Sequence, residues 1–273
     1  MPALDAIAIA RELTDAYTHR RILPAPLSTR DSSFDLNAAY AVETELVRMR
    51  RAEGHTTVGR KVGYANKAVW RALKLDTLVW AHMYDDTVRY AGGDGTVAVG
   101  AMCSPKIEPE IVFKIGTPLN GASDPADVLS HVEWVALGFE IIDCVFADWK
   151  FQPPDFVAAF GLHAALVVGE PRPVHASTAA ELGDQLARFT VRLSRNGEVV
   201  AEGSGRNSLR SPALCLAELS AAISRRTPDD TLTAGELVSS GTLTDSQAIS
   251  AGETWMAAVE GIDLPPLSLR VIT

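Results

Sequence analysis

The sequence of 273 residues has few cysteines and no long uninterrupted apolar run, and both shortages restrict its class. Cys103, Cys144 and Cys215 are widely spaced and form no Cys-x-x-Cys pair, which predicts free buried thiols in a reducing compartment. The most apolar stretch, 132–146, contains acidic residues and is shorter than the roughly 20 residues that a membrane helix needs. We therefore expect neither a disulfide framework nor a membrane span.

Basic residues are in the minority, because 25 Lys and Arg stand against 34 Asp and Glu, which gives a formal net charge of −9 at pH 7. This balance argues against a phosphate-binding track for nucleic acid and against an anionic membrane surface, both of which need clustered cations. No basic segment precedes the first apolar residues, so no signal peptide is expected. The sequence predicts a cytoplasmic protein without nucleic-acid or membrane partners.

Signatures of several large enzyme classes are also missing. The sequence has no Gly-x-Gly-x-x-Gly after an expected strand, no P-loop, no His-Glu-x-x-His and no Gly-x-Ser-x-Gly. Nicotinamide-dependent, nucleotide-dependent and serine-hydrolase activities therefore have no support in the sequence.

What the sequence does contain is a helical first third followed by strand patterns. Apolar residues recur at helical spacing over 7–17 and 36–51, with Asp35 as a plausible N-cap of the second helix. Further helices are expected over 67–73 and 209–224. Runs rich in Val, Ile, Leu and Phe predict strands, and Asn196-Gly197 predicts a hairpin turn. The expected strands are 107–115, 132–145, 164–168, 189–193, 237–243 and 267–272.

This order of elements predicts an α+β fold rather than regular βαβ alternation. We expect a helical N-terminal region over residues 1–75 and a β-rich catalytic core over residues 76–273. The sheet of that core should be mostly antiparallel or mixed.

The most informative local feature is the pair Glu108 and Glu110, separated by Pro109. Alternate residues of a strand share a face, so the two carboxylates can converge on one object. They repel one another unless a cation or a proton lies between them. Pro109 cannot donate a ladder hydrogen bond, which suggests an edge or a bulge. Taken alone, two solvated glutamates on an exposed face would be the commoner explanation.

A later apolar run carries two more carboxylates, Glu140 and Asp143. Charged groups in such a run are rarely left unpaired. Three carboxylates with open positions for water or substrate suit a hard cation such as Mg²⁺ or Mn²⁺. The alternative is a buried Glu140 that pairs with an arginine or a lysine and needs no metal.

Several ordered segments give the chain a resemblance to a known group of enzymes. They include 58–63, 81–86, 105–113, 139–143, 148–150, 166–169 and 234–244. On these segments the chain resembles the 2-keto-4-pentenoate hydratase and 4-oxalocrotonate decarboxylase group of the fumarylacetoacetate hydrolase superfamily. The resemblance covers nearly the whole chain. It implies a mixed β-roll core and a divalent metal, Mg²⁺ or Mn²⁺, held by Glu108, Glu110 and Glu140.

The same resemblance implies roles for further residues. Lys61 matches an active-site lysine whose ammonium can hold a substrate carboxylate or position a water, although a surface ion pair would be the default for a lone lysine. Asp85 belongs to a matching acidic pair that could equally cap a turn. Ser240, Gly241 and Thr242 match a loop that could bond substrate oxygens, or could simply end a strand.

One segment departs from the group. Many of its hydratases carry Asp-Asn-Ala-Ser shortly before the Leu-Val-Val-Gly strand, where this chain has Ala159-Phe160-Gly161-Leu162-His163. His163 is the nearby titratable replacement, and an imidazole can move protons near neutral pH. A structural histidine beside a strand is the alternative.

Together these features predict a metal-dependent hydratase that adds water to a 2-hydroxy-2,4-dienoate and gives a 4-hydroxy-2-oxo acid, as in aromatic catabolism. Decarboxylation of a 4-oxalocrotonate-like acid and carbon–carbon hydrolysis of an acylpyruvate are alternatives with the same enolate chemistry. A non-catalytic partner subunit of such an enzyme is an alternative of another class. The expected partners are a small 2-oxo or 2-hydroxydienoate acid and further copies of the chain in a homo-oligomer.

Overall fold

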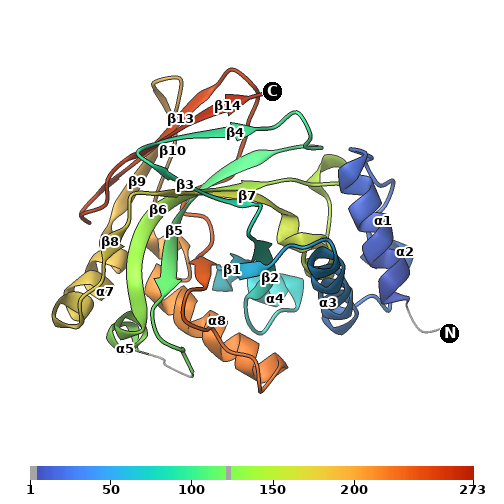
Figure 1. The fold of residues 1–273 in the computed structure, drawn as a ribbon, viewed down its shortest axis with the longest axis horizontal. Helices are drawn as coiled ribbons and strands as arrows, with labels where there is room; N and C mark the ends of the chain where they lie inside the picture. Colours follow the sequence, from blue (N-terminus) through green and yellow to red (C-terminus); the bar gives the residue numbers. More distant parts are fainter. Residues whose placement is uncertain (1–4, 121–123) are drawn as a thin grey trace.

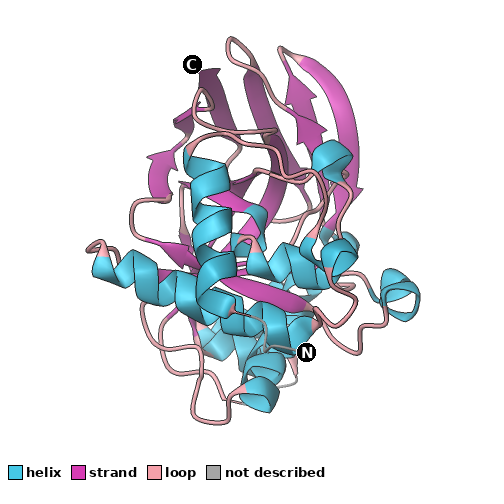
Figure 2. Ribbon diagram, turned by 90° about the vertical axis from the view of Figure 1, so that its right-hand side faces the viewer, coloured by secondary structure: helices cyan, strands magenta, loops and turns pink. Residues whose placement is uncertain are grey.

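The computed structural model describes residues 5–120 and 124–273, which form two β-sheets and a set of helices that lie mostly beside and below them in the view of Figure 1. The helices are α1 Ala6–Thr18, α2 Leu27–Arg30, α3 Leu36–Ala52, α4 Lys67–Leu73, α5 Pro125–Ser130, α6 Pro153–Ala158, α7 Ala179–Arg188 and α8 Pro212–Arg226. Figure 2 shows most of them gathered on one side of the strands. None of the described helices is long and apolar enough to cross a membrane.

The larger sheet has nine strands, seven of which follow the order β2-β1-β11-β5-β6-β7-β3. They are β1 Thr57–Gly63, β2 Val79–Tyr84, β3 Val88–Gly92, β5 Lys106–Ile115, β6 Val132–Ile142, β7 His163–Gly169 and β11 Leu237–Ser239. The short strands β8 Arg172–Pro173 and β12 Gln247–Ala248 pair with β6 and β5.

The second sheet has five strands in the order β10-β9-β13-β14-β4. They are β4 Asp94–Ala98, β9 Thr190–Arg195, β10 Glu198–Ser204, β13 Thr254–Glu260 and β14 Leu267–Ile272. Three pairs are parallel, namely β1 with β11, β3 with β7 and β4 with β14, and the other described ladders are antiparallel. The fold is therefore α+β with mixed sheets, as predicted.

Local signals in the sequence explain several of these elements. The Asp35 carboxylate accepts the backbone N–H groups of Asn37 and Ala38 at 2.9 and 3.0 Å, which confirms the predicted cap of α3. Between β9 and β10, Asn196 and Gly197 have φ values of 53° and 89°, which confirms the predicted hairpin turn. The three cysteines are free, with Cys103 half-buried and the other two buried.

Two predicted strands end later than the observed ones and one predicted helix begins earlier, and each difference has a physical reason. β6 ends at Ile142, because the carboxylate of the next residue, Asp143, accepts the backbone N–H groups of Cys103 and Ser104 in the loop before β5. β11 ends at Ser239, because Gly241 adopts a φ of 90° and leaves the ladder. Helix α8 begins at Pro212, because Leu209 and Arg210 have φ values of 49° and 71°.

Helices α1, α2 and α3 lie together at one end of the molecule (Figure 1). Strand β1, which also falls within the predicted N-terminal region, lies inside the large sheet between β2 and β11. β1 therefore carries side chains from the first quarter of the chain to the centre of that sheet. This placement is what brings Lys61 next to residues of β6.

Candidate active site

Three glutamates from two neighbouring strands converge at the centre of the large sheet. In the antiparallel ladder of β5 and β6, Glu108 lies directly opposite Glu140, and Glu110 is two residues further along the same face of β5. Each can offer one carboxylate oxygen such that the three oxygens lie within 4.8 Å of one another. This spacing is suited to a single cation with oxygen ligands.

The surroundings of Glu110 show an unfilled bonding position. One oxygen, Oε2, accepts the Ser239 hydroxyl at 2.5 Å and the Gly241 backbone N–H at 2.8 Å. The other oxygen, Oε1, is buried and has no hydrogen-bond partner among the described residues. A buried carboxylate oxygen without a partner is costly, so an additional ligand such as a cation fits here.

Glu140 is fully buried between two basic side chains. Its Oε2 lies 3.1 Å from the Lys61 Nζ, and its Oε1 lies 2.8 Å from the His163 Nδ1. Burial alone would raise the pKa of Glu140, but the adjacent Lys61 and His163 lower it below its ordinary value. The two basic neighbours therefore favour the ionised form of Glu140, which is the form that can bind a cation.

The pKa values of the other two carboxyl groups, Glu108 and Glu110, are raised instead of lowered. Burial, partly offset by Lys61 and reinforced by Glu140, raises the pKa of Glu108 to about 7. Burial and the charges of Glu140 and Glu108 hold the pKa of Glu110 well above its ordinary range. Without a cation these groups favour protons, and a divalent cation would supply the positive charge that lets them ionise.

Lys61 is the cation of the site, although its side chain is only 2% exposed. Its ammonium donates to the Gly161 carbonyl at 2.9 Å and lies 4.7 Å from the centre of the Phe156 ring. Gly161 has a φ of 59°, and a Cβ there would lie 2.8 Å from the Lys61 Cδ. A glycine is needed at this position because the lysine side chain passes against its backbone.

A pocket of about 550 Å³ opens beside these groups. Lys61, Glu108, Gly241 and Thr242 line it together with apolar side chains and with further polar residues, namely Asn66, Asn207, Thr244, Asp245 and Ser246. The apolar lining includes Val62, Tyr64, Val69, Ile142, Trp149, Phe151, Phe156 and Leu162. Two of the three predicted loop residues, Gly241 and Thr242, thus face the pocket. The third, Ser240, is buried and its carbonyl accepts the Ser208 hydroxyl at 2.6 Å.

His163 contacts the site from another direction. Its Nδ1 bonds Glu140, its Nε2 lies 2.9 Å from the Thr87 hydroxyl, and its side chain is only 1% exposed. It lines a separate cavity of about 380 Å³ with Tyr17 and Tyr84, and it is not among the residues that line the larger pocket. The imidazole therefore reaches the site through Glu140.

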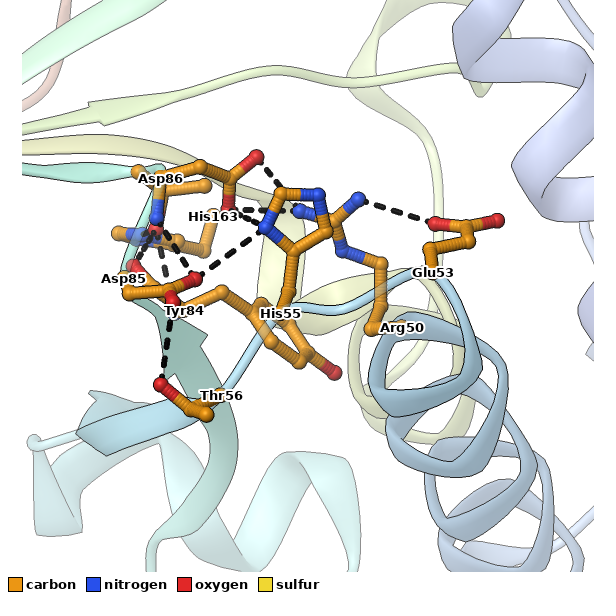
Figure 3. A network of polar contacts seen from close by, with 9 residues as sticks. Arg50, Glu53, His55, Thr56, Tyr84, Asp85, Asp86 and His163 are labelled. Atoms are coloured by element: carbon orange, nitrogen blue, oxygen red, sulfur yellow. Dashed lines mark hydrogen bonds and ion pairs between the residues drawn. The ribbon is translucent and has the colours of Figure 1, made fainter.

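Asp85 lies in a surface network at the turn between β2 and β3 (Figure 3). Its carboxylate lies 3.2 Å from the His55 Nδ1 and accepts the Thr56 hydroxyl at 3.1 Å. The neighbouring Asp86 pairs with Arg50 at 2.6 Å. Asp85 is exposed and is not among the residues that line either cavity, so the structure does not bring it to the three glutamates.

Sequence reasoning missed the residues that shape the site without bearing charge. Gly161 receives the lysine, and Trp149, Phe151 and Phe156 form an aromatic wall. The backbone around them is irregular, with left-handed φ values at Trp149 and Phe160. No periodic pattern predicts such a segment, and the available signals were the matching segment 148–150 and the departure of 159–163 from the group.

A cluster of carboxylates that could hold a cation, beside a buried lysine and an open pocket on an α+β scaffold, defines the class of protein as an enzyme. The comparisons with known proteins agree. The chain belongs to the fumarylacetoacetate hydrolase family, because residues 58–271 match the family described as "Fumarylacetoacetate (FAA) hydrolase C-terminal". The predicted resemblance is thereby confirmed.

Individual relatives cover most of the chain. It is 31% identical over 243 residues to 2-keto-4-pentenoate hydratase 1 of Dechloromonas aromatica, which covers 87% of both chains. It is 27% identical over 254 residues to a 4-oxalocrotonate decarboxylase of a Pseudomonas species, which covers 93% of this chain and 94% of the relative. Among solved structures, 4-oxalocrotonate decarboxylase from Pseudomonas putida, complexed with magnesium and adipate, superposes with a TM-score of 0.87 at 25% identity. That match covers 100% of this chain and 99% of the other.

Proposed function

We propose that this protein is a metal-dependent hydratase that converts a 2-hydroxy-2,4-dienoate to a 4-hydroxy-2-oxo acid. The observation that carries the proposal is the convergence of Glu108, Glu110 and Glu140 beside the buried Lys61. Relatives named as hydratases of 2-keto-4-pentenoate and of 2-hydroxyhexa-2,4-dienoate support the substrate class.

Glu108, Glu110 and Glu140 would hold Mg²⁺ or Mn²⁺, because the partnerless Glu110 oxygen and the raised pKa of Glu108 fit a bound dication. When bound, the ion would act as a Lewis acid toward the carboxylate and the neighbouring oxygen of the substrate. The similar 4-oxalocrotonate decarboxylase structure complexed with magnesium supports a divalent ion of this kind.

Lys61 would bind and orient the reacting molecules. An ammonium has three N–H donors. One is donated to the Gly161 carbonyl, and the charge is balanced by Glu140, which leaves a donor for a substrate carboxylate or an attacking water in the pocket. The dienol must first take a proton at the far end of its conjugated system before water can add. Gly241 and Thr242 line the same space and would contact substrate oxygens.

His163 and Asp85 would contribute indirectly, since neither lines the pocket. His163 would position Glu140 through the bond between Nδ1 and Oε1, with Thr87 holding the opposite ring nitrogen. Asp85 would have only a small structural effect, through the turn that it shares with Thr87, whose backbone N–H donates to the Tyr84 carbonyl at 3.0 Å.

The test is hydration of freshly generated 2-hydroxypenta-2,4-dienoate in the presence of Mg²⁺ or Mn²⁺. The reaction is monitored by the loss of the diene absorbance, and the product is then identified. We expect turnover that chelation abolishes and that Glu108→Gln reduces by at least about 100-fold, because the substitution removes one anionic ligand. Turnover that is insensitive to both would contradict the proposal. A chain that binds the ion tightly but turns nothing over would instead be a non-catalytic partner subunit.

A second candidate is decarboxylation of a 4-oxalocrotonate-like acid. It is favoured by the superposition on 4-oxalocrotonate decarboxylase over the full length of both chains. The two reactions differ in product, so 2-oxohex-3-enedioate supplied with Mg²⁺ would release carbon dioxide only if this candidate is correct.

The finer features of the assignment are a mixed β-roll core with a helical N-terminal region, a homo-oligomeric state and a cytoplasmic location. They are supported by the family resemblance, and light scattering would test the oligomeric state.

A further inference from the structure

We propose that Ser239 is a positioning residue that restricts Glu110 to a single metal-binding oxygen, and that it thereby favours Mg²⁺ or Mn²⁺ over Ca²⁺. The inference rests on the proposed function, because it assumes that the three glutamates hold a divalent cation. It concerns the groups around the carboxylates, which decide how many oxygens each carboxylate can offer.

The two carboxylate oxygens of Glu110 have different surroundings. Oε2 accepts the Ser239 hydroxyl at 2.5 Å and the Gly241 backbone N–H at 2.8 Å. Oε1 is buried and has no hydrogen-bond partner among the described residues. A carboxylate oxygen has about two acceptor positions, so the two donors use the capacity of Oε2. Oε1 is therefore the oxygen of Glu110 that can bind a cation.

Glu140 shows the same division of its oxygens. Its Oε1 lies 2.8 Å from the His163 Nδ1. Its Oε2 faces the Lys61 ammonium at 3.1 Å, but it is a buried atom that forms no hydrogen bond with the described residues. Glu108 differs, because it is half-buried and lines the open pocket. The two fully buried glutamates thus each have one oxygen held by a protein group and one that is not.

The groups that hold Glu110 Oε2 are themselves fixed by the sheet. Ser239 is fully buried at the end of β11, where it is paired with both β1 and β5. The next residue is anchored as well, because the Ser240 N–H donates to the Ile111 carbonyl at 3.1 Å and its carbonyl accepts the Ser208 hydroxyl at 2.6 Å. Donors that are fixed in this way keep Oε2 occupied when a cation approaches Oε1.

This division of the oxygens affects the choice of ion. Ca²⁺ takes about six to eight oxygen ligands and often binds a carboxylate through both oxygens, whereas Mg²⁺ requires nearly octahedral geometry at shorter distances. Mn²⁺ also suits octahedral oxygen sites. Two glutamates that each offer one oxygen leave the remaining positions to Glu108, water and substrate. Such a set fits the smaller ions and withholds the additional oxygens that Ca²⁺ would use.

The test measures the dissociation constants of Mn²⁺ and Ca²⁺ by calorimetry at one pH, without substrate. We expect the wild-type protein to bind Mn²⁺ at least about tenfold more tightly than Ca²⁺. Ser239→Ala should weaken Mn²⁺ binding by about tenfold or more, because Glu110 loses a group that orients it. The preference for Mn²⁺ over Ca²⁺ should fall by about threefold or more, because Oε2 then has one donor and can take part in binding the larger ion.

Two further variants separate ion selection from a loss of stability. Ser220→Ala is the matched control, because Ser220 is also buried and donates its hydroxyl to the Leu119 carbonyl at 3.0 Å, in helix α8. This variant should keep the wild-type preference. His163→Ala frees the other oxygen of Glu140 and should lower the preference, as Ser239→Ala does.

Two results would overturn the inference. One is an unchanged preference in Ser239→Ala, because a general loss of structure weakens the binding of both ions alike and only a change in the glutamate oxygens alters their ratio. The other is equal affinity of the wild-type protein for Mn²⁺ and Ca²⁺, a result that requires no variant to fold.

The failure of this inference and of the proposed function are distinguishable. If the dienoate is hydrated with Mn²⁺ but Ser239→Ala keeps the wild-type preference, the hydratase assignment stands and the role of Ser239 fails. If Ser239→Ala lowers the preference but no dienoate is hydrated, the role of Ser239 stands and the hydratase assignment fails.

Discussion

Because Gly161 has no side chain, the Lys61 side chain can pass against its backbone and reach the site. The lysine side chain passes so close that a Cβ on residue 161 would lie 2.8 Å from its Cδ and 2.8 Å from the Ala81 Cβ. The Gly161 carbonyl then receives the ammonium at 2.9 Å. Glycine at this position thus sets the direction of the one cation that lines the pocket among the described residues.

We predict that Gly161→Ala lowers both stability and activity. The left-handed φ of 59° costs about 1 kcal/mol for a residue with a Cβ, and the contact with Lys61 adds to that cost. Displacement of the ammonium should reduce kcat/KM by at least about tenfold, because the substrate or water loses an aligned donor. Denaturant unfolding and steady-state kinetics measure the two effects.

Gly197→Ala is the matched control for backbone strain alone. Gly197 has a φ of 89°, but nothing lies within 4 Å of its missing Cβ, and it belongs to the hairpin between β9 and β10. This variant should lose about 1 kcal/mol of stability and keep its kcat/KM. If both variants retained full activity, the contact between Gly161 and Lys61 would have no role in the reaction.

For Asp85, we predict that Asp85→Asn leaves kcat/KM within about threefold of the wild-type value. Its partners His55 and Thr56 lie on the surface, and exposed ion pairs contribute at most about 1 kcal/mol. Steady-state kinetics at saturating Mg²⁺ would show this. A loss of two orders of magnitude would mean that the β2–β3 turn moves to the site during the reaction.

At the scale of elements, the antiparallel pairing of β5 and β6 creates the site, because it places Glu108, Glu110 and Glu140 close enough for their negative charges to repel one another. Because the folded-state pKa of Glu108 is raised from 4.5 to about 7, the folded apoprotein binds more protons than the unfolded chain between these two values. Stability must then fall as pH rises through this window. The pKa of Glu110 is raised as well, whereas the lowered pKa of Glu140 affects the free energy of unfolding only below pH 4.5.

We therefore predict that the metal-free protein loses up to about 3 kcal/mol of unfolding free energy from Glu108 between pH 4.5 and pH 7. Urea unfolding with a chelator present, measured across this range, would reveal the slope. Glu108→Gln has no such titration and should show a shallower slope. The same slope in both proteins would mean that Glu108 has an ordinary pKa in the folded state.

The ladder also shows what sequence could and could not predict. Alternation along β5 placed Glu108 and Glu110 on one face, and the cap at Asp35 and the turn at Asn196 were readable because their causes are local. The ion pair between Lys61 and Glu140 joins β1 to β6, strands that do not pair with each other, and its partners are far apart in the sequence. The aromatic wall depends on left-handed residues such as Trp149, which tertiary contacts must hold.

For the molecule as a whole, a divalent cation should act as a stabilising ligand of the native fold. The three glutamates come together only when β5 and β6 pair, so the folded state binds the ion far more tightly than the unfolded chain. At about 100 times Kd, this linkage adds about 2.7 kcal/mol, which corresponds to an increase in Tm of roughly 5–10 °C for a chain of this size. Thermal unfolding with and without Mn²⁺ would measure the shift.

Two variants locate the origin of that shift, because the structure contains a second group of candidate ligands in His55, Asp85 and Asp86. In that group Arg50 already neutralises Asp86, and the carboxylates are exposed, so an ion would gain little there. Glu108→Gln should therefore abolish the increase in Tm, and Asp85→Asn should preserve it. The reverse outcome would place the tight site at the surface turn and leave the buried glutamates to proton binding alone.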